Sequence, residues 1–201
     1  MTSEIPETKS IKEFAIESLA IAECNLLDAL KSLRPEDVNR QIFPNINPII
    51  WIFGHCAAHM DKVFGIWCQG TQVLTESQHA FYSFGAAKEE IKAGLPASFR
   101  ELVDAYLSIS NSCFHYLNQL PEDEFYKIPS NFPEERDKES HFQLIQRVSL
   151  HFMGHMGQIL TIRRALGNPG SSFVSGMFKK YREKQVTAWK EWWEANKTQF
   201  T

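Results

Sequence analysis

The chain has 201 residues, of which 43% are hydrophobic and 22% are charged, a balance that is typical of one globular domain and excludes a disordered chain. The formal net charge of −3 excludes an overall basic surface, so nucleic acid is not expected as the main partner. No run approaches the roughly 18–20 apolar residues of a membrane span, and the polar first segment, MTSEIPETKSIKEF, lacks the pattern of a signal peptide. We therefore expect no association with a membrane.

The four cysteines indicate free thiols rather than disulfides or a cysteine-based zinc site. No two of them are spaced C-x-x-C, and four are too few for a disulfide framework in a chain of this length. This use of cysteine predicts a cytoplasmic protein. The residues are Cys24, Cys56, Cys68 and Cys113.

The first predicted helix begins at a capping box, in which Ser10 and Glu13 satisfy two otherwise unpaired backbone N–H groups. Apolar residues at helical spacing continue to about Leu33, and the next two residues, Arg-Pro, end the helix. The second helix is predicted over 48–69, with Asn47 as its N-cap. Its first half, IIWIFGHCAAHM, is apolar on nearly every side, so we expect it to be buried.

A long connection over 71–97 follows, and a short helix is predicted there around 86–93. The length of this connection is unusual for an ordinary loop in a compact domain. Ser98 and Glu101 then form a second capping box, which opens a third helix over 98–120.

A polar connector over 121–139 leads to the fourth helix. Its charged run, EERDK at 134–138, is expected to be solvated surface. Ser140 and Gln143 form a third capping box, and the helix behind it is predicted to run to Leu166, before a Gly-Asn-Pro stop signal.

A linker over 168–176 leads to a last helix near 180–197, whose apolar side is rich in tryptophan. No segment alternates as a strand does. We therefore predict an all-α fold, a four-helix bundle with a long connection between helices 2 and 3 and an appended C-terminal helix. One domain is expected over 1–201, with the bundle over 8–167 and the linker and tryptophan-rich helix over 168–201.

Histidine spacing on the fourth helix indicates a metal site. His151 and His155 are four residues apart, which brings two imidazoles to one face of a helix, within reach of a single metal ion. Gly154 and Gly157 lie beside them, although glycine disfavours a helix by about 1 kcal/mol relative to alanine. Close approach of a neighbouring helix, or room for a ligand, would explain both glycines.

The second helix carries another such pair, His55 and His59, in its most apolar half. Burying four imidazoles without partners would cost several kcal/mol, and a shared metal ion supplies the partner. Helical periodicity slightly favours His59 over His55 as the ligand. Other kinds of site fit less well, since the H-E-x-x-H motif of a zincin does not occur. A di-iron bundle needs Glu-x-x-His on two helices, and the spacing of Glu76 and His79 falls in the connection. A Cys–His nucleophile is disfavoured because Cys56 points about 100° away from His55.

Several segments resemble the DinB family, the DinB/YfiT-like metal-binding four-helix bundles. NPIIWIFGHCAAHMDKVFG is similar to the family's second helix with its W-x-x-G-H element, and LIQRVSLHFMGHMGQILTIRRALGNPG to its fourth, where H-x-x-x-H precedes Gly-Gln. The link LNQLPEDEFYKIPS is also similar, and together the likeness covers about residues 10–170. Two features depart from the family pattern, the extra His59 and the tail 176–201.

The resemblance implies a divalent metal, usually zinc or nickel, on His55, His151 and His155, with open positions for water or substrate. It also implies a reaction on a small molecule with a low-molecular-weight thiol, as in the family's S-transferases and its maleylpyruvate isomerase. Three neutral imidazoles leave the ion its full charge, so a bound thiol would lose its proton. His59, Asp61 and Gln158 are the candidates for an acid or base nearby.

Two other functions are consistent with the sequence. A fourth ligand, His59, would close the site and make the protein a non-catalytic, metal-stabilised bundle. Alternatively, a metal-free interaction module could grip a partner, or a second copy in a homodimer, through the last helix. Its tryptophans are Trp189, Trp192 and Trp193, of which Trp192 is expected to be exposed.

Overall fold

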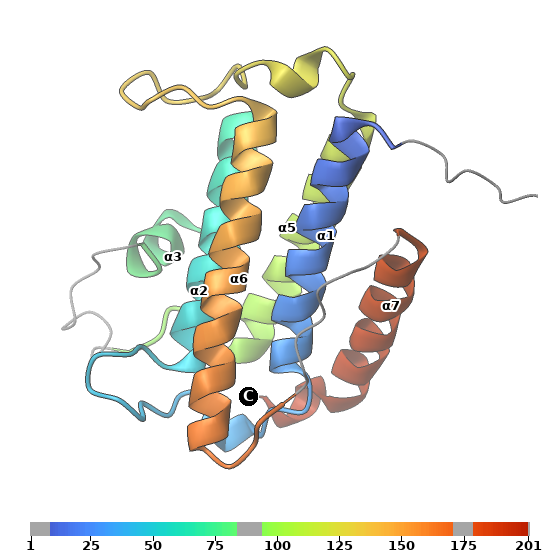
Figure 1. Cartoon of the computed structure of the whole chain (residues 1–201). Coiled ribbons are helices and arrows are strands. Elements are labelled where there is room, and N and C mark those ends of the chain that lie inside the picture. The colour runs from blue at the N-terminus through green and yellow to red at the C-terminus, as the bar shows by residue number, and fades with distance from the viewer. Residues whose placement is uncertain (1–8, 84–93, 171–178, 201) are drawn as a thin grey trace, which may run out of the picture.

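The computed structural model describes residues 9–83, 94–170 and 179–200, and within these ranges the chain forms helices and no strands. Four long helices make the bundle (Figure 1). They are α1 (Ile11–Leu30), α2 (Ile49–Met60), α5 (Phe99–Gln119) and α6 (His141–Ala165). The predicted all-α four-helix bundle is thus confirmed. Short 3-10 turns lie at Pro35–Asp37, Glu124–Tyr126 and Lys197–Gln199.

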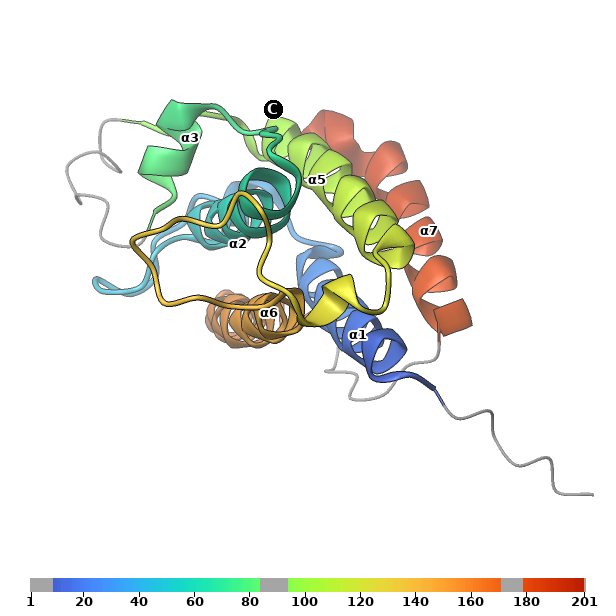
Figure 2. The ribbon, with the colours of Figure 1, turned by 90° about the horizontal axis from the view of Figure 1, so that it is seen from above.

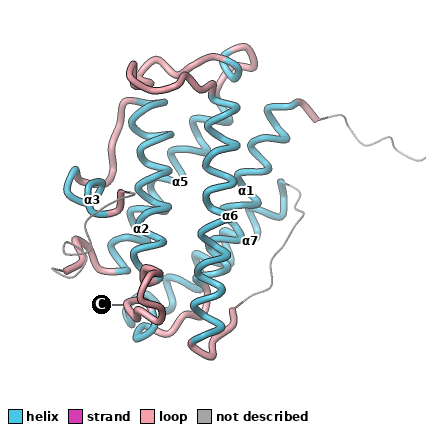
Figure 3. Tube along the Cα trace, turned by 60° about the vertical axis from the view of Figure 1, so that its left-hand side comes forward, coloured by secondary structure: helices cyan, strands magenta, loops and turns pink. Residues whose placement is uncertain are grey.

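Each helix of the bundle packs on two others, since α1 and α2 both contact α5 and α6. Two further helices of the described ranges lie outside this ring. The last helix, α7 (Lys179–Asn196), packs against α1 and lies beside α5 when the molecule is seen from above (Figure 2). A short helix, α3 (Glu76–Phe81), lies on the outer side of α2 (Figure 3). The long connection and the appended helix are therefore both present.

Local capping explains where the helices begin. In each of the three predicted capping boxes, the serine side chain accepts the N–H of the third helical residue, whose own side chain accepts the N–H of the serine. A fourth box, formed by Thr75 and Gln78, opens α3, a helix absent from our expectation. The helix expected over 86–93 lies outside the described residues.

The second helix differs from the prediction at both ends. Its N-cap is Pro48 rather than Asn47, and no side chain caps its first turn. The α-helix ends at Met60 and continues as a π-helix over Asp61–Trp67. Wide turns of this kind are frequent at functional sites. As its apolar sequence predicts, α2 is buried along its length, with His59 as the exception.

The tryptophans of α7 fasten this helix to its own bundle. Trp189 and Trp193 are 1% and 0% exposed, and their indole N–H groups donate to the Leu27 carbonyl oxygen and to Asp104 Oδ1, respectively. Trp192 is half-buried rather than exposed, and its ring packs against that of Trp189. These contacts occupy the surface that a partner-gripping helix would need. No described helix is long and apolar enough to cross a membrane.

Candidate metal centre

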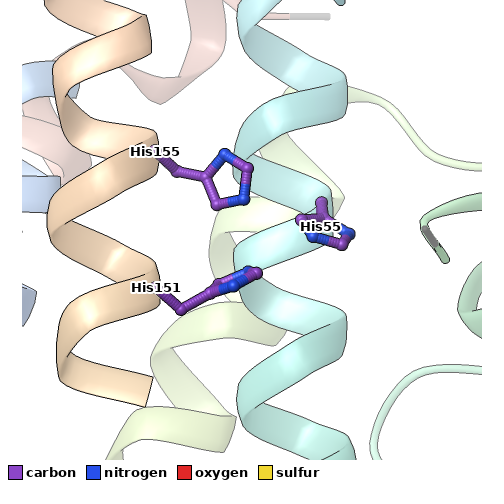
Figure 4. A group of neighbouring side chains, drawn as sticks. All are labelled: His55, His151 and His155. Carbon is purple, nitrogen blue, oxygen red and sulfur yellow. The ribbon is translucent and has the colours of Figure 1, made fainter. Parts of the chain in front are cut away.

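Three imidazoles from two facing helices meet in the bundle. His55 comes from α2, and His151 and His155 from adjacent turns of α6, with their side chains directed toward one another (Figure 4). Each offers one ring nitrogen, and these three nitrogens lie within 4.8 Å of one another. The spacing of four residues on α6 therefore places two potential ligands on the face that α2 covers.

The orientation of His55 is fixed from outside the bundle. Its Nδ1 lies 2.5 Å from the carbonyl oxygen of Tyr82, just beyond the end of α3, so Nδ1–H donates to this oxygen. Its ring also stacks on that of Trp51, with centroids 5.1 Å apart and planes 9° apart. Because Nδ1 is occupied, Nε2 is the nitrogen left for a metal, an arrangement typical of metal-ligating histidines.

The two histidines of α6 also leave Nε2 available for a metal ion. His155 Nδ1 lies 2.8 Å from Gln158 Oε1, one turn further along, which leaves Nε2 of His155 available. The Nε2 of His151 is buried and finds no hydrogen-bond partner among the described residues. Such an atom costs about 1–3 kcal/mol when it stays unpaired. A divalent cation would satisfy it, so the residues present fit the metal that the sequence implies.

Burial keeps these imidazoles neutral, the form that binds metal. It lowers the pKa of His55 and His155 below the usual value of 6.5. Burial, followed by the neighbouring His59, lowers the pKa of His151 to about 2. A neutral imidazole presents a lone pair at neutral pH, so a cation would not have to displace protons there.

His59 lies beside the three imidazoles. Its ring stacks on that of His151, with centroids 4.1 Å apart, and its Nε2 is buried without a partner in the described part of the chain. The group of nitrogens within 4.8 Å nevertheless consists of His55, His151 and His155. Helical periodicity slightly favoured His59 as the ligand of α2, but the observed geometry favours His55. Burial, then the nearby histidines and cations, lowers the pKa of His59 to about 3.

The imidazoles open into a pocket of about 860 Å³. The volume is in the range of small-molecule sites, which span about 300–1,000 Å³. Aromatic walls come from Trp51, Trp67 and Tyr82, and cationic side chains from Lys62, Arg136 and Arg147. Arg136 belongs to the charged run over 134–138, which is exposed as we expected, and its guanidinium also lies over the Trp67 ring.

A second polar pair, His79 and Asp61, lies at this pocket, and His79 comes from the Glu76–His79 spacing that we placed in the connection. His79 of α3 lines the pocket, and its Nε2 lies 2.9 Å from Oδ2 of Asp61. Asp61 is 1% exposed and also accepts the backbone N–H groups of Val73 and Leu74. Asp61, a predicted acid or base, therefore uses its carboxylate to bind the connection between α2 and α5 and to orient His79. The Thr75–Gln78 capping box was the signal that could have placed His79 on a helix.

Three further expectations are settled by packing. A β-carbon at Gly154 or Gly157 would meet nothing within 4 Å, so of our two explanations for these glycines, close approach of a neighbouring helix is wrong. Gly54 is the tightly packed glycine instead, because a β-carbon there would overlap the ring of Tyr82. Cys56 is fully buried, and burial raises the pKa of its thiol, which disfavours a Cys–His nucleophile. All four cysteines are free.

The chain is similar to known proteins in both sequence and fold. A model of the DinB superfamily matches residues 19–159. A solved structure, the conserved protein of locus from Enterococcus faecalis, is 17% identical with a TM-score of 0.61, and the match covers 78% of this chain and 97% of that one. YfiT from Bacillus subtilis, described as a probable metal-dependent hydrolase with an unusual four-helix bundle topology, is 14% identical with a TM-score of 0.56, over 82% and 93% of the two chains. No curated protein matches.

Proposed function

The chain belongs to the DinB superfamily, and from this membership and its histidine geometry we propose that it is a metal-dependent enzyme acting on a small molecule. In this proposal His55, His151 and His155 hold a divalent ion, zinc or nickel. One observation carries it: the buried Nε2 of His151, which has no hydrogen-bond partner among the described residues, lies beside two imidazoles whose Nδ1 atoms are already engaged. Three protein ligands leave positions open for a substrate, as catalytic sites require.

When bound, such an ion supplies a Lewis acid that makes a coordinated thiol or water more acidic. Two reaction classes follow. The family resemblance of the sequence favours transfer of a thiol to a small electrophile, or a thiol-dependent isomerisation. The description of YfiT favours hydrolysis. Both need a residue in the pocket that takes up or returns a proton.

We assign the role of this acid–base residue to His79. Its Nε2–H donates to the buried Asp61, so Nδ1 is the atom left to take a proton from a pocket ligand. His59, our earlier candidate, is a poorer base because its pKa is lowered to about 3, and it fits better as a neutral neighbour of His151. Gln158, the other candidate, has an amide that is neither protonated nor ionised near neutral pH and so cannot serve as a general acid or base, and it orients His155 instead.

The test is a turnover assay of zinc- and nickel-loaded protein with low-molecular-weight thiols plus electrophiles, and in parallel with small esters and amides. We expect one class to turn over, and His151→Ala to abolish it. His79→Gln should keep its metal and lower kcat by about 10²–10⁴-fold, the range typical of a lost acid–base group. His115→Gln, at an exposed position on α5, is the matched control. Equal rates in wild type and His151→Ala would contradict the proposal.

One observation favours a second candidate, a metal-stabilised bundle without catalysis. His59 stacks directly on His151 and its Nε2 has no partner in the described part of the chain, so a change of its rotamer could supply a fourth ligand. A four-histidine site would be closed to substrate. Retained metal with no turnover in either assay, together with a large loss of metal affinity in His59→Phe, would favour this candidate.

A further inference from the structure

The charge of the pocket wall differs in sign from that of the chain. The protein carries 24 acidic and 21 basic residues, yet no described residue that lines the pocket is Asp or Glu. Three lining residues are cationic: Lys62, Arg136 and Arg147. The imidazoles beside them provide no balancing negative charge, and a divalent ion would add to the positive charge.

The three cations are not equivalent. Arg147 is already paired, because its guanidinium contacts both carboxylate oxygens of Glu139, with Nε 3.0 Å from Oε1. Lys62 and Arg136 form no ion pair within the described ranges. Arg136 is an exposed residue whose guanidinium lies over the Trp67 ring, 5.2 Å from the centroid, and Trp67 is itself 3% exposed. Its donors are therefore positioned but not used by the protein.

We propose that the substrate carries an anionic group, and that Lys62 and Arg136 bind this group while the reacting atom lies at the three imidazoles. This inference rests on the proposed function and names the substrate class for the same pocket. A guanidinium offers paired N–H donors that match the geometry of a carboxylate, and an ammonium adds a point charge. The field of both would also draw an anion into a pocket of an otherwise negative protein.

The test separates the charge of the ligand from its ability to contact the metal. Cobalt-loaded protein is titrated with mercaptopropionate and mercaptohexanoate, and with mercaptopropanol and mercaptohexanol, which have the same lengths without the charge. The sulfur-to-cobalt charge-transfer absorption reports binding without any turnover. The same titrations are made with Lys62→Gln, Arg136→Gln, the double variant and Arg100→Gln. Arg100 is exposed on α5, so this control changes the net charge equally outside the pocket.

In wild type, at least one acidic thiol should bind about tenfold more tightly than its alcohol, which corresponds to an interaction of ordinary size for charged groups. This preference should fall about fivefold in each single variant, further in the double variant, and also at high salt, while Arg100→Gln retains it. Comparing the acid-to-alcohol ratio of each variant with that of wild type removes differences in intrinsic thiol acidity, because these are the same for every protein.

Three results would overturn the inference. The first is an acid-to-alcohol ratio near one in wild type. The second is a preference that persists in the double variant, since the carboxylate would then contact the metal rather than the two side chains. The third is cobalt-loaded protein whose spectrum responds to none of the thiols. A chain that fails to bind cobalt at all instead contradicts the proposed function, so the two failures are distinguishable.

Discussion

The Nδ1 atom of His55 donates a hydrogen bond to the carbonyl oxygen of Tyr82 over 2.5 Å. This bond joins a ligand candidate inside the bundle to a connection outside it. The Tyr82 ring is 0% exposed and lies where a β-carbon on Gly54 would be. Gly54, next to His55, therefore allows Tyr82 to lie close against α2. This close approach places the Tyr82 carbonyl oxygen at Nδ1 of His55 and leaves Nε2 for a metal ion.

Gly54→Ala should displace the Tyr82 ring and weaken the bond from His55. We expect a loss of stability of about 1–3 kcal/mol from overpacking. Zinc affinity should fall roughly tenfold, as it does when an outer hydrogen-bond partner of a ligand is lost. Urea denaturation and competition with a chelating dye measure the two effects.

Gly157→Ala is the matched control on α6. A β-carbon there meets nothing within 4 Å, so the substitution adds helix propensity alone and should stabilise the protein by about 0.5–1 kcal/mol. Unchanged zinc affinity in Gly54→Ala would show that Tyr82 does not orient His55 for a metal.

Asp61→Asn should destabilise the protein by about 1.5–3 kcal/mol. The buried carboxylate accepts N–H groups from Val73, Leu74 and His79, and hydrogen bonds to a charged acceptor are worth more than neutral ones. Glu76→Gln, an exposed acid on α3, should have little effect. Thermal melting and the imidazole resonances of His79 check this prediction, and stability equal to that of Glu76→Gln would refute it.

His59→Phe distinguishes the open site from the closed one. The variant removes a buried Nε2 that has no partner in the described part of the chain, so metal-free stability should rise by about 1 kcal/mol. Zinc affinity should stay close to that of wild type if three histidines form the site, because His59 lies outside the group of nitrogens within 4.8 Å. A loss as large as that in His155→Phe would identify His59 as a fourth ligand.

Metal-free protein should lose stability as the pH falls. Burial lowers the folded-state pKa of His59 to about 3 and that of His151 to about 2, whereas in the unfolded chain these groups titrate near 6.5. Protons therefore bind the unfolded chain first. The stability is full above about pH 6.5 and decreases as the pH falls toward 3, by at most about 1.4 kcal/mol per pH unit for each histidine.

Urea denaturation between pH 7.5 and 4 measures this dependence. The slope should be smaller in His59→Phe, which removes one of the groups. A stability that stays constant over this range would show that the histidines are not shielded from water as their burial implies.

The bundle was predictable from the sequence because its signals are local. The boxes at Ser10, Ser98 and Ser140 satisfy their own helix ends, so nearby residues suffice to find them. The His151–His155 pair is local too, since both residues lie on one helix face. Positions that depend on packing across the chain were harder, and the unfilled space at Gly154 shows that glycine alone does not indicate a close approach.

The outer part of the site depends on contacts that no periodicity encodes. Asp61 and His79 are separated by 18 positions and meet only because a π-helix and a capped short helix bring the connection back onto α2. Arg136 reaches the pocket from a polar connector that has no regular pattern. The choice between His55 and His59 likewise required Tyr82, whose carbonyl lies 27 positions away from His55.

Metal analysis after equilibrium dialysis against limiting zinc tests the central claim most directly. Wild type and the exposed control His115→Ala should each retain one ion per chain, and His151→Ala should lose affinity by more than the roughly 100-fold typical of an outer-shell change. Equal zinc content in wild type and His151→Ala, whether high or negligible, would contradict the proposal that His55, His151 and His155 share a metal ion.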